Sequence, residues 1–366
     1  MKRIFLKRMR FLVLFFLLLM PLFAFRASAQ GEAEEFLSEL REVLPPALRT
    51  EDTEELLSRV GAEGMLREIY AALSEESGAF ASFLLLCLGS TVLIAAAHSV
   101  ADGAAGGLSE GLSAAVMGIA IFEPLRMCTD ATVRLINESA ALFGAASPIL
   151  HGITLAAGGV QSAAAGAAGA QITLYVVELF FCRLVVPVTS VLMALGLIST
   201  IGEEGAALAS LSGGIKRIFL WMLGLGTTLL SAALSLQAVL TAGADNAAMR
   251  TAKYTASGLL PLVGGAVSAS LSTLAAGLSF VKSTAGASVV AALLLLTVPA
   301  LIHLLLYRFC LDISAGFSEF LGIRAAARMF SAFRSGMDAL IAVLAVSSVL
   351  FLLQSVLFLY AGVAIL

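Results

Sequence analysis

The chain has 366 residues, of which 60% are apolar and only 13% are charged. Soluble domains carry about 25% charged residues, so a water-soluble globule of this composition would have too little polar surface to cover itself. The formal net charge of −3 and the lack of a basic surface exclude nucleic-acid binding. Composition therefore predicts an all-α, polytopic integral membrane protein in contact with the lipid bilayer.

The N-terminal residues 1–29 hold six basic groups and no acids. They begin with MKRIFLKRMR, continue with an apolar run from Phe11 to Phe25, and end with Ala27-Ser28-Ala29. A basic start, a short apolar run and an Ala-x-Ala end predict a secretory signal peptide, cleaved after Ala29. An uncleaved signal anchor is the alternative, and both interpretations place residue 30 outside the cytoplasm.

Residues 30–78 form an acidic segment, with thirteen acidic and four basic groups. Apolar residues recur on one face of three short stretches, as at Phe36, Leu40 and Leu44, which predicts amphipathic helices. We expect this extracytoplasmic segment to be either a solvated collar packed on the helical bundle or a docking surface for other extracytoplasmic domains.

Residues 79–366 form the predicted transmembrane domain, with about eight spans after the signal peptide. A span needs about 20 mostly apolar residues. The clear candidates are residues 79–99, 171–199, 218–242, 283–306 and 339–365, and the weaker ones are residues 108–127, 139–157 and 255–281.

Two basic segments orient the predicted bundle. Residues 243–254 carry Arg250 and Lys253, and residues 307–338 carry four arginines. Two predicted spans separate the segments, so both would lie on one side, which the positive-inside rule makes the cytoplasm. Lys216 then falls on the wrong side. Residues 307–338 also carry apolar stripes typical of helices in the interface plane, either an elbow that caps the bundle or a site for a cytoplasmic partner.

Proline spacing suggests a possible inverted repeat. Pro148 and Pro187 are 39 residues apart, and Pro261 and Pro299 are 38 apart. The shift between the two pairs is about 112 residues, or three predicted spans, and an odd number of spans inverts the second copy. Secondary transporters are often built in this way, and chance is the competing explanation.

Glu178 and Arg183 are the ionisable residues predicted to lie deepest in the membrane. Five residues separate them, or about 140° around an α-helix, so we expect them on different faces, each with a partner from another helix. Charges at membrane depth usually face the bundle interior. The two residues would thus form a structural polar network or line a conduction path, for which Gln237 is a further candidate.

A second charged cluster comprises Asp245, Arg250 and Lys253, at a predicted span junction. It is either a set of snorkelling side chains at the membrane interface or a polar lining or coupling site. Pro261 and the Gly264-Gly265 pair follow it. They form a candidate helix break that would open backbone groups to a cavity.

Motifs for catalysis or metal binding are missing from the sequence. The four cysteines and three histidines are scattered without metal-ligand spacing. Neither the phosphate-binding Gly-x4-Gly-Lys-[Ser/Thr] motif nor His-Glu-x-x-His occurs, and no Ser/His pairing or Asp dyad stands out. We therefore expect no enzymatic activity, no metal and no cofactor.

The most distinctive motifs lie between Lys216 and Gly265 and continue from Cys310 to Gly322. They are Trp221-x-Leu223-Gly224-Leu225, Leu234-Ser235-Leu236-Gln237, Arg250-Thr251-Ala252-Lys253 and Pro261-Leu262-Val263-Gly264-Gly265. In these motifs, and in outline over nearly its whole length, the chain resembles the stage III sporulation protein AE family. One departure is Ala244-Asp245-Asn246, where the family pattern leads us to expect Asp-Gly.

This resemblance implies a function that hydropathy does not give. Members of the family sit in the mother-cell membrane that engulfs the forespore. With the other stage III A sporulation proteins and the forespore stage II Q protein, they form a channel or secretion-like apparatus needed for forespore development. A non-conducting membrane platform that assembles ring-forming partners is the alternative, and an intramembrane enzyme is a third, weaker one.

Overall fold

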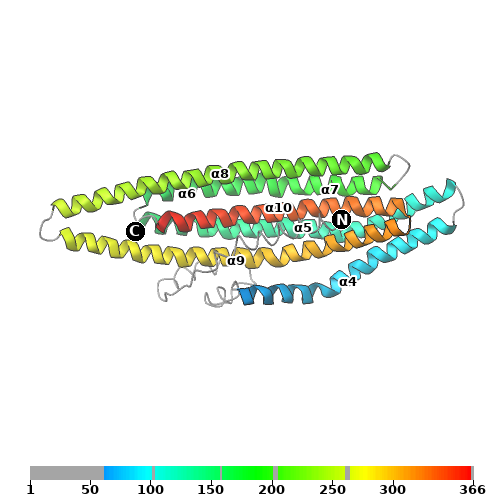
Figure 1. The fold of residues 1–366 in the computed structure, drawn as a ribbon, viewed down its shortest axis with the longest axis horizontal. Helices are drawn as coiled ribbons and strands as arrows, with labels where there is room; N and C mark the ends of the chain where they lie inside the picture. The colour runs from blue at the N-terminus through cyan, green and yellow to red at the C-terminus, as the bar shows by residue number, and fades with distance from the viewer. Residues whose placement is uncertain (1–61, 101–103, 157–158, 201–204, 260–263, 364–366) are drawn as a thin grey trace.

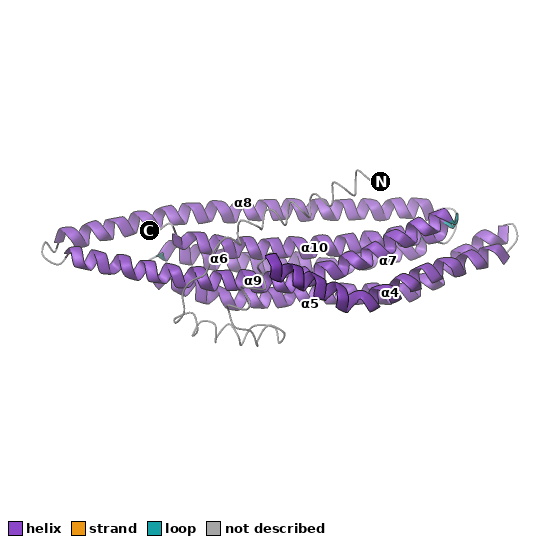
Figure 2. Cartoon of the chain, turned by 60° about the horizontal axis from the view of Figure 1, so that its bottom comes forward, coloured by secondary structure: helices purple, strands orange, loops and turns teal. Residues whose placement is uncertain are grey.

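The computed structural model describes residues 62–100, 104–156, 159–200, 205–259 and 264–363. Within these residues every regular element is a helix, as Figure 2 shows, and no strand occurs. The predicted all-α fold class is therefore confirmed for the described part of the chain. The elements are α4 (Ala62–Val100), α5 (Ala104–Ala156), α6 (Val160–Val176), the π-helix η3 (Val177–Cys182), α7 (Arg183–Ile198), α8 (Gly205–Leu259), α9 (Gly264–Phe320) and α10 (Arg324–Val363).

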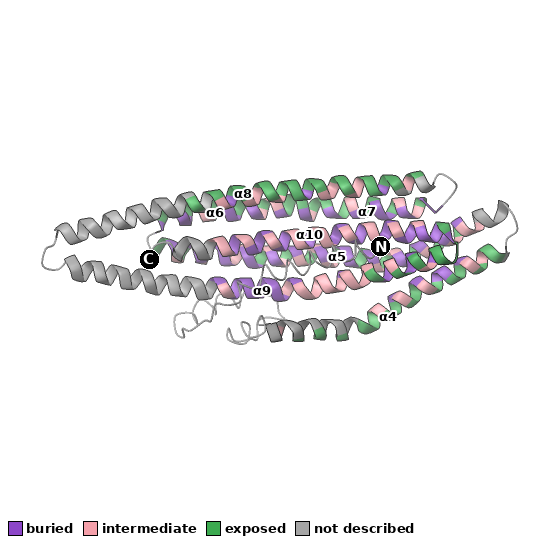
Figure 3. Ribbon diagram, in the orientation of Figure 1, coloured by how far each residue is buried: buried purple, intermediate pink, exposed green. Residues whose placement is uncertain are grey.

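The helices run up and down along one long axis and form an elongated bundle (Figure 1). At about 1.5 Å per residue, α8 and α9 are each ~80 Å long, more than twice the ~30 Å hydrocarbon core of a bilayer. Burial differs among the helices, since α8 is largely exposed where its side chains are described, whereas α10 is largely buried (Figure 3). Helix α10 is thus the centre of the bundle.

Six helical segments of the described chain are long and apolar enough to cross a membrane. The predicted signal peptide and residues 30–61 lie outside the described residues. Residues 62–78 form the first turns of α4, and this helix continues through the predicted domain boundary at residue 79. The six segments are Ser77–Ser99, Ser109–Ala156, Val160–Ile198, Ser210–Leu236, Gly286–Phe320 and Arg324–Leu357.

Two of the predicted helix boundaries are wrong, and the count of eight spans is not confirmed. The predicted spans 108–127 and 139–157 are one continuous helix, α5, with Pro124 and Pro148 inside it. Prolines are tolerated in membrane helices because neighbouring groups satisfy the freed carbonyls, so neither proline marks a turn. The predicted span 255–281 is instead divided between α8 and α9.

The predicted loop 307–338 is the tip of a helical hairpin rather than an elbow in the interface plane. Helix α9 continues to Phe320, and α10 begins at Arg324. Gly322 has a φ of 78°, the left-handed conformation that favours glycine after a helix end. The N–H of Ile323 donates to the Ser318 carbonyl at 2.9 Å, which satisfies the end of α9 and turns the chain sharply.

The continuous helix α9 removes the charge argument on which the predicted orientation depends. One helix, α9, rather than two spans separates Arg250 and Lys253 from the arginines of residues 307–338, so the two basic segments lie at opposite ends of the bundle (Figure 1). They do not share a side, and the charge argument for the cytoplasmic face fails. Lys216, which had seemed misplaced, lies at the end of the bundle that carries residues 307–338.

The inverted repeat is overturned for the same reason. The first proline pair lies in the hairpin of α5 with α6–α7, and the second belongs to the hairpin of α8 with α9. Helices α5 and α8 both start at the same end of the bundle (Figure 1). A copy shifted by one hairpin therefore keeps its direction, because two helices rather than three separate the copies.

Glycines let the central helices approach closely. A Cβ atom on Gly118 of α5 would overlap Leu197 Cδ2 of α7, and one on Gly196 of α7 would lie 2.8 Å from the Cβ of Ala332 in α10. Small residues at such contacts allow helix backbones to pack tightly in lipid. The fully buried side chains of the core include Phe143, Phe330, Phe333 and Phe351.

Candidate functional site

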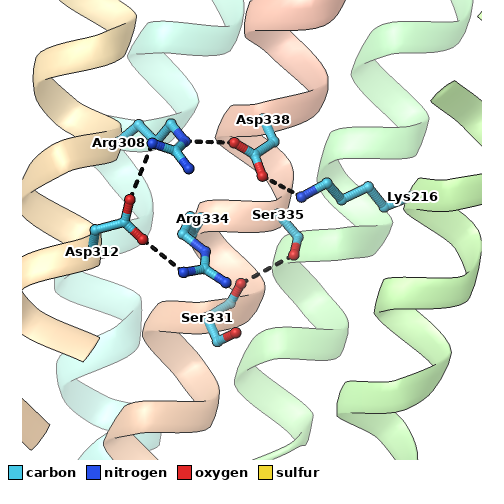
Figure 4. A network of polar contacts seen from close by, with 7 residues as sticks. All are labelled: Lys216, Arg308, Asp312, Ser331, Arg334, Ser335 and Asp338. Carbon is cyan, nitrogen blue, oxygen red and sulfur yellow. Dashed lines mark hydrogen bonds and ion pairs between the residues drawn. The ribbon is translucent and has the colours of Figure 1, made fainter. Parts of the chain in front are cut away.

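Charged side chains from α8, α9 and α10 meet in a partly buried network (Figure 4). We call Lys216, Arg308, Asp312, Arg334 and Asp338 the inner ionic network. Arg308 Nε donates to Asp338 Oδ1 at 2.6 Å, and Lys216 Nζ donates to the other oxygen of the same carboxylate. Arg308 Nη1 lies 3.1 Å from Asp312 Oδ2, and Arg334 Nη1 lies 2.7 Å from Asp312 Oδ1.

The network forms because α9 and α10 each carry an arginine followed four residues later by an aspartate. Arg308 and Asp312 are four residues apart on α9 and so share a face, which meets Arg334 and Asp338 on α10. The side chain of Asp338 is only 13% exposed, and that of Lys216 is 17% exposed. Charges at this burial need partners, and here each carboxylate binds two cations. The network therefore ties α8 to the α9–α10 hairpin.

Sequence reasoning missed the inner ionic network. The prediction assigned Lys216 to one side of the membrane and Arg308 to the other, because it counted three spans between them, 218–242, 255–281 and 283–306. The structure has two helices there, α8 and α9, which bring both residues to the same end of the bundle. One signal was available: Asp338 stands directly before the apolar run 339–365. An acid at that depth calls for a cation from another helix.

Glu178 and Arg183 pair with each other, which corrects the prediction that they lie on different faces. Arg183 Nη2 donates to Glu178 Oε1 at 2.9 Å. The reason is the π-helix η3, whose backbone bonds join residues five apart, and the Arg183 N–H indeed donates to the Glu178 carbonyl. Pro187 follows one α-turn after Arg183 and lacks the N–H that an unbroken α-helix needs there, so a local change of helix type is expected.

The Glu178–Arg183 pair lies on the outside of the bundle rather than inside it. The two side chains are 62% and 70% exposed. Beside the pair, Cys182 Sγ donates to Asn137 Oδ1 of α5 at 3.2 Å, so η3 lies against the middle of α5. The expectation that these charges face the bundle interior is therefore wrong for the single chain.

An open groove of about 470 Å³ runs along this contact of α5 with α7. We call this groove, together with the Glu178–Arg183 pair beside it, the outer charged groove. Its neighbours on α5 include Arg126, whose Nε lies 3.8 Å from Asp130 Oδ2. Within the described residues, no hydrogen bond or ion pair is found for Arg134 or Glu138. The lining residues are Asp130, Val133, Arg134, Asn137, Glu138, Ala141 and Val186.

The remaining predicted site residues lie toward the far end of the α8–α9 hairpin. Gln237, Asp245, Arg250 and Lys253 belong to α8, but their side chains are outside the described part of the structure. Helix α8 ends at Leu259, before Pro261, which is itself not described, and α9 begins with Gly264-Gly265. The candidate helix break thus falls between two helices rather than inside one.

No metal centre is found in the described helices: they contain no group of three or more His, Cys, Asp or Glu residues that could hold a metal ion. The four cysteines are free thiols, and Cys87, Cys128 and Cys310 are buried. Two charged clusters of the described bundle are compared below, one inside the bundle and one outside it.

Comparisons with known proteins identify the family. The family model of stage III sporulation protein AE matches residues 46–362, which is most of the chain and includes every described helix from α4 to α9. Neither the search of the curated proteins nor that of the solved structures found a match. The chain, whose described part holds six helices able to span a membrane, belongs to the stage III sporulation protein AE family, whose role is in sporulation.

Proposed function

We propose that this protein is a membrane component of a channel or secretion-like complex between mother cell and forespore. It would act with the other stage III A sporulation proteins and the forespore stage II Q protein, in the mother-cell membrane that engulfs the forespore. Family membership supports the sporulation role. The single structural observation that carries the channel proposal is the outer charged groove, because it offers polar groups on the outer side of apolar helices.

The proposal places the polar route between chains rather than through one chain. The core of the described bundle is filled by apolar side chains such as Phe143, Phe330 and Phe351, and the charges of the inner ionic network bind one another. By contrast, Glu178 and Arg183 point outward. A water-filled route lined by these two residues would therefore need further chains to enclose it.

The alternative is a non-conducting platform that assembles ring-forming partners. The inner ionic network favours it, because paired charges across three helices make a stiff support rather than a passage. Channel and platform differ in whether water reaches the outer charged groove in the assembled complex.

Cysteine accessibility in sporulating cells separates the two functions. Glu178→Cys and Ala141→Cys at the groove are compared with Gly226→Cys on the exposed face of α8 as the control. Every variant also carries Cys182→Ser, so that this partly exposed native thiol does not react. If the protein contributes to a channel, a membrane-impermeant thiol reagent modifies the groove positions and not the control. A groove that stays unmodified in a complex that still supports sporulation would favour the platform. If deletion of the gene leaves sporulation intact, both proposals fail.

A further inference from the structure

The outer charged groove lies far from either end of an apolar helical run. Glu178 and Arg183 follow residues 160–177 and precede residues 184–198 of the continuous run from α6 to α7. Both flanking stretches are uncharged and span ~27 and ~22 Å at 1.5 Å per residue. A bilayer centred on this run, with a hydrocarbon core of ~30 Å, therefore sets the charges of the groove at membrane depth.

A bilayer shifted along the bundle exposes apolar side chains instead. Shifted toward α6, it leaves Val186, Val191 and Ile198 of α7 in water, with 39%, 46% and 53% of their surfaces exposed. Shifted toward α7, it leaves the exposed side chains of Val160 and Ile172 in water. Large exposed apolar surfaces are unfavourable in water, so the centred placement is favoured, and the charges of the groove then need protein around them.

Two charges of the groove lack a partner in the described part of the chain. Asp130 and Glu178 each have an arginine at salt-bridge distance, 3.8 and 2.9 Å away. Arg134 and Glu138 stand one helical turn apart on α5 and line the groove, yet neither forms a hydrogen bond or ion pair within the described helices. Because an unpaired charge at membrane depth is costly, each of the two calls for an opposite charge from elsewhere.

The surroundings that fit are narrowed by charge and depth. Lipid tails carry no charge. A second copy related by a two-fold axis along the membrane normal would set Arg134 against Arg134 and Glu138 against Glu138, and the inner ionic network offers no free pair because its charges bind one another. A helix satisfies its own backbone groups at this depth, so a helix of another protein is the fitting cover.

We propose that the outer charged groove binds a membrane helix of a different protein, one that carries an acid and a base one turn apart within an apolar run. The acid lies opposite Arg134 and the base opposite Glu138, and this order determines the partner and its register. Exposed Ala141, one turn further along α5, is small and lets the two helices approach closely.

The inference extends the proposed membrane complex by naming the kind of helix that joins it. It needs only that the bundle lies in a membrane, and it does not depend on whether the complex conducts anything. Failure of the helix contact is measured by cross-linking and failure of the proposed function by sporulation, so the two are distinguishable.

Cross-linking to two designed helices tests the contact. The full chain with Ala141→Cys and Cys182→Ser is co-expressed in membranes with a single-span helix of about 20 Leu and Ala residues. One designed helix has Glu followed four residues later by Lys, and the other has the reverse order. Both have a cysteine one turn outside each charge, and the same basic flanks give them the same orientation.

An oxidant should cross-link one of the two orders about tenfold more than the other, because the wrong order opposes like charges. Gly226→Cys with Cys182→Ser, on the exposed face of α8, is the control and should show no preference for either order. Equal cross-linking of both orders to Ala141→Cys, or none to the folded chain, would overturn the proposal. A band that joins two copies of the chain in place of the designed helix would also overturn it.

Charge exchange identifies the residues responsible for the preference. Arg134→Glu with Glu138→Arg should reverse it, so that the order rejected by the original groove becomes the one that cross-links. Arg126→Glu with Asp130→Arg is the matched control, since it exchanges the neighbouring pair and should keep the original preference. A preference that is the same with and without the exchange at residues 134 and 138 would contradict the proposed pairing.

Discussion

The two charged clusters differ in where their partners lie. In the inner ionic network, the carboxylates of Asp312 and Asp338 each bind two cations from the same chain. In the outer charged groove, Glu178 and Arg183 pair on an exposed surface, while Arg134 and Glu138 have no partner within the described residues. Similar residue types thus stabilise the bundle in one place and leave unsatisfied charge in the other. Burial, rather than composition, separates a structural from an interacting cluster.

The largest expected effect follows from removing the shared carboxylate of the inner ionic network. Asp338→Ala leaves Lys216 without its ion-pair partner at low exposure, and breaking a buried pair in this way costs about 3–5 kcal/mol. We expect this loss of unfolding free energy in mixed detergent titrations. Asp130→Ala in the outer charged groove is the matched control and should change it by less than about 1 kcal/mol. Equal losses for the two variants would remove the distinction between the clusters.

A smaller effect is expected at the close contact of α7 with α10. Gly196→Ala places a Cβ atom 2.8 Å from the Cβ of Ala332, and such overpacking costs about 1–3 kcal/mol. Gly226→Ala on the exposed face of α8 meets no atom within 4 Å and should stabilise the helix by roughly 0.5–1 kcal/mol. The same detergent titration gives both values, and stabilisation by Gly196→Ala would show that the helices are not in tight contact.

The hairpin turn gives an effect of about 1–2 kcal/mol. Gly322→Ala forces a side chain into the left-handed region at a φ of 78°, which costs about that much. Gly316→Ala in α9, where a Cβ atom meets nothing within 4 Å, is the control. If Gly322→Ala is no more destabilising than Gly316→Ala, the turn at residues 321–323 is not formed as described.

The smallest effect on stability is expected at η3, although its effect on function should be larger. Because the pair is exposed, Arg183→Glu should change the unfolding free energy by less than about 1 kcal/mol. Sporulation should fall, and Glu178→Arg in the same chain should restore it if the two residues pair. Failure of the exchange to restore sporulation would mean that Arg183 acts through another residue.

The sequence was sufficient to predict the helical class, the membrane character and the family, because apolar composition and local motifs carry that information directly. It was insufficient for the helix boundaries. Residues 128–138 of α5 look like a charged loop in hydropathy, yet Asp130, Arg134 and Glu138 line a groove on the outside of a continuous helix. Residues 307–338 look like a cytoplasmic loop for the same reason, although Asp338 pairs with Lys216 from a distant part of the chain and with Arg308 within the segment.

The Glu178–Arg183 pair illustrates why the candidate site was only partly predictable. Both residues were identified from their depth in an apolar run, which is a sequence property. Their pairing depends on a π-helix, which places residues five apart on one face, whereas the prediction assumed α-helical geometry. Pro187 was the available signal, because its missing N–H disturbs the preceding turn.

The central claim, that protein covers the outer charged groove in the membrane, is tested most directly by a spin label at Arg134→Cys in native membranes. Frequent collisions of the spin label with oxygen indicate that it faces lipid, and frequent collisions with a water-soluble nickel complex indicate that it faces water. For a covered groove we expect few collisions with either reagent at residue 134, and frequent oxygen collisions at Trp221→Cys on the exposed face of α8. Oxygen collisions at residue 134 as frequent as at residue 221 would place the groove against lipid and contradict the claim.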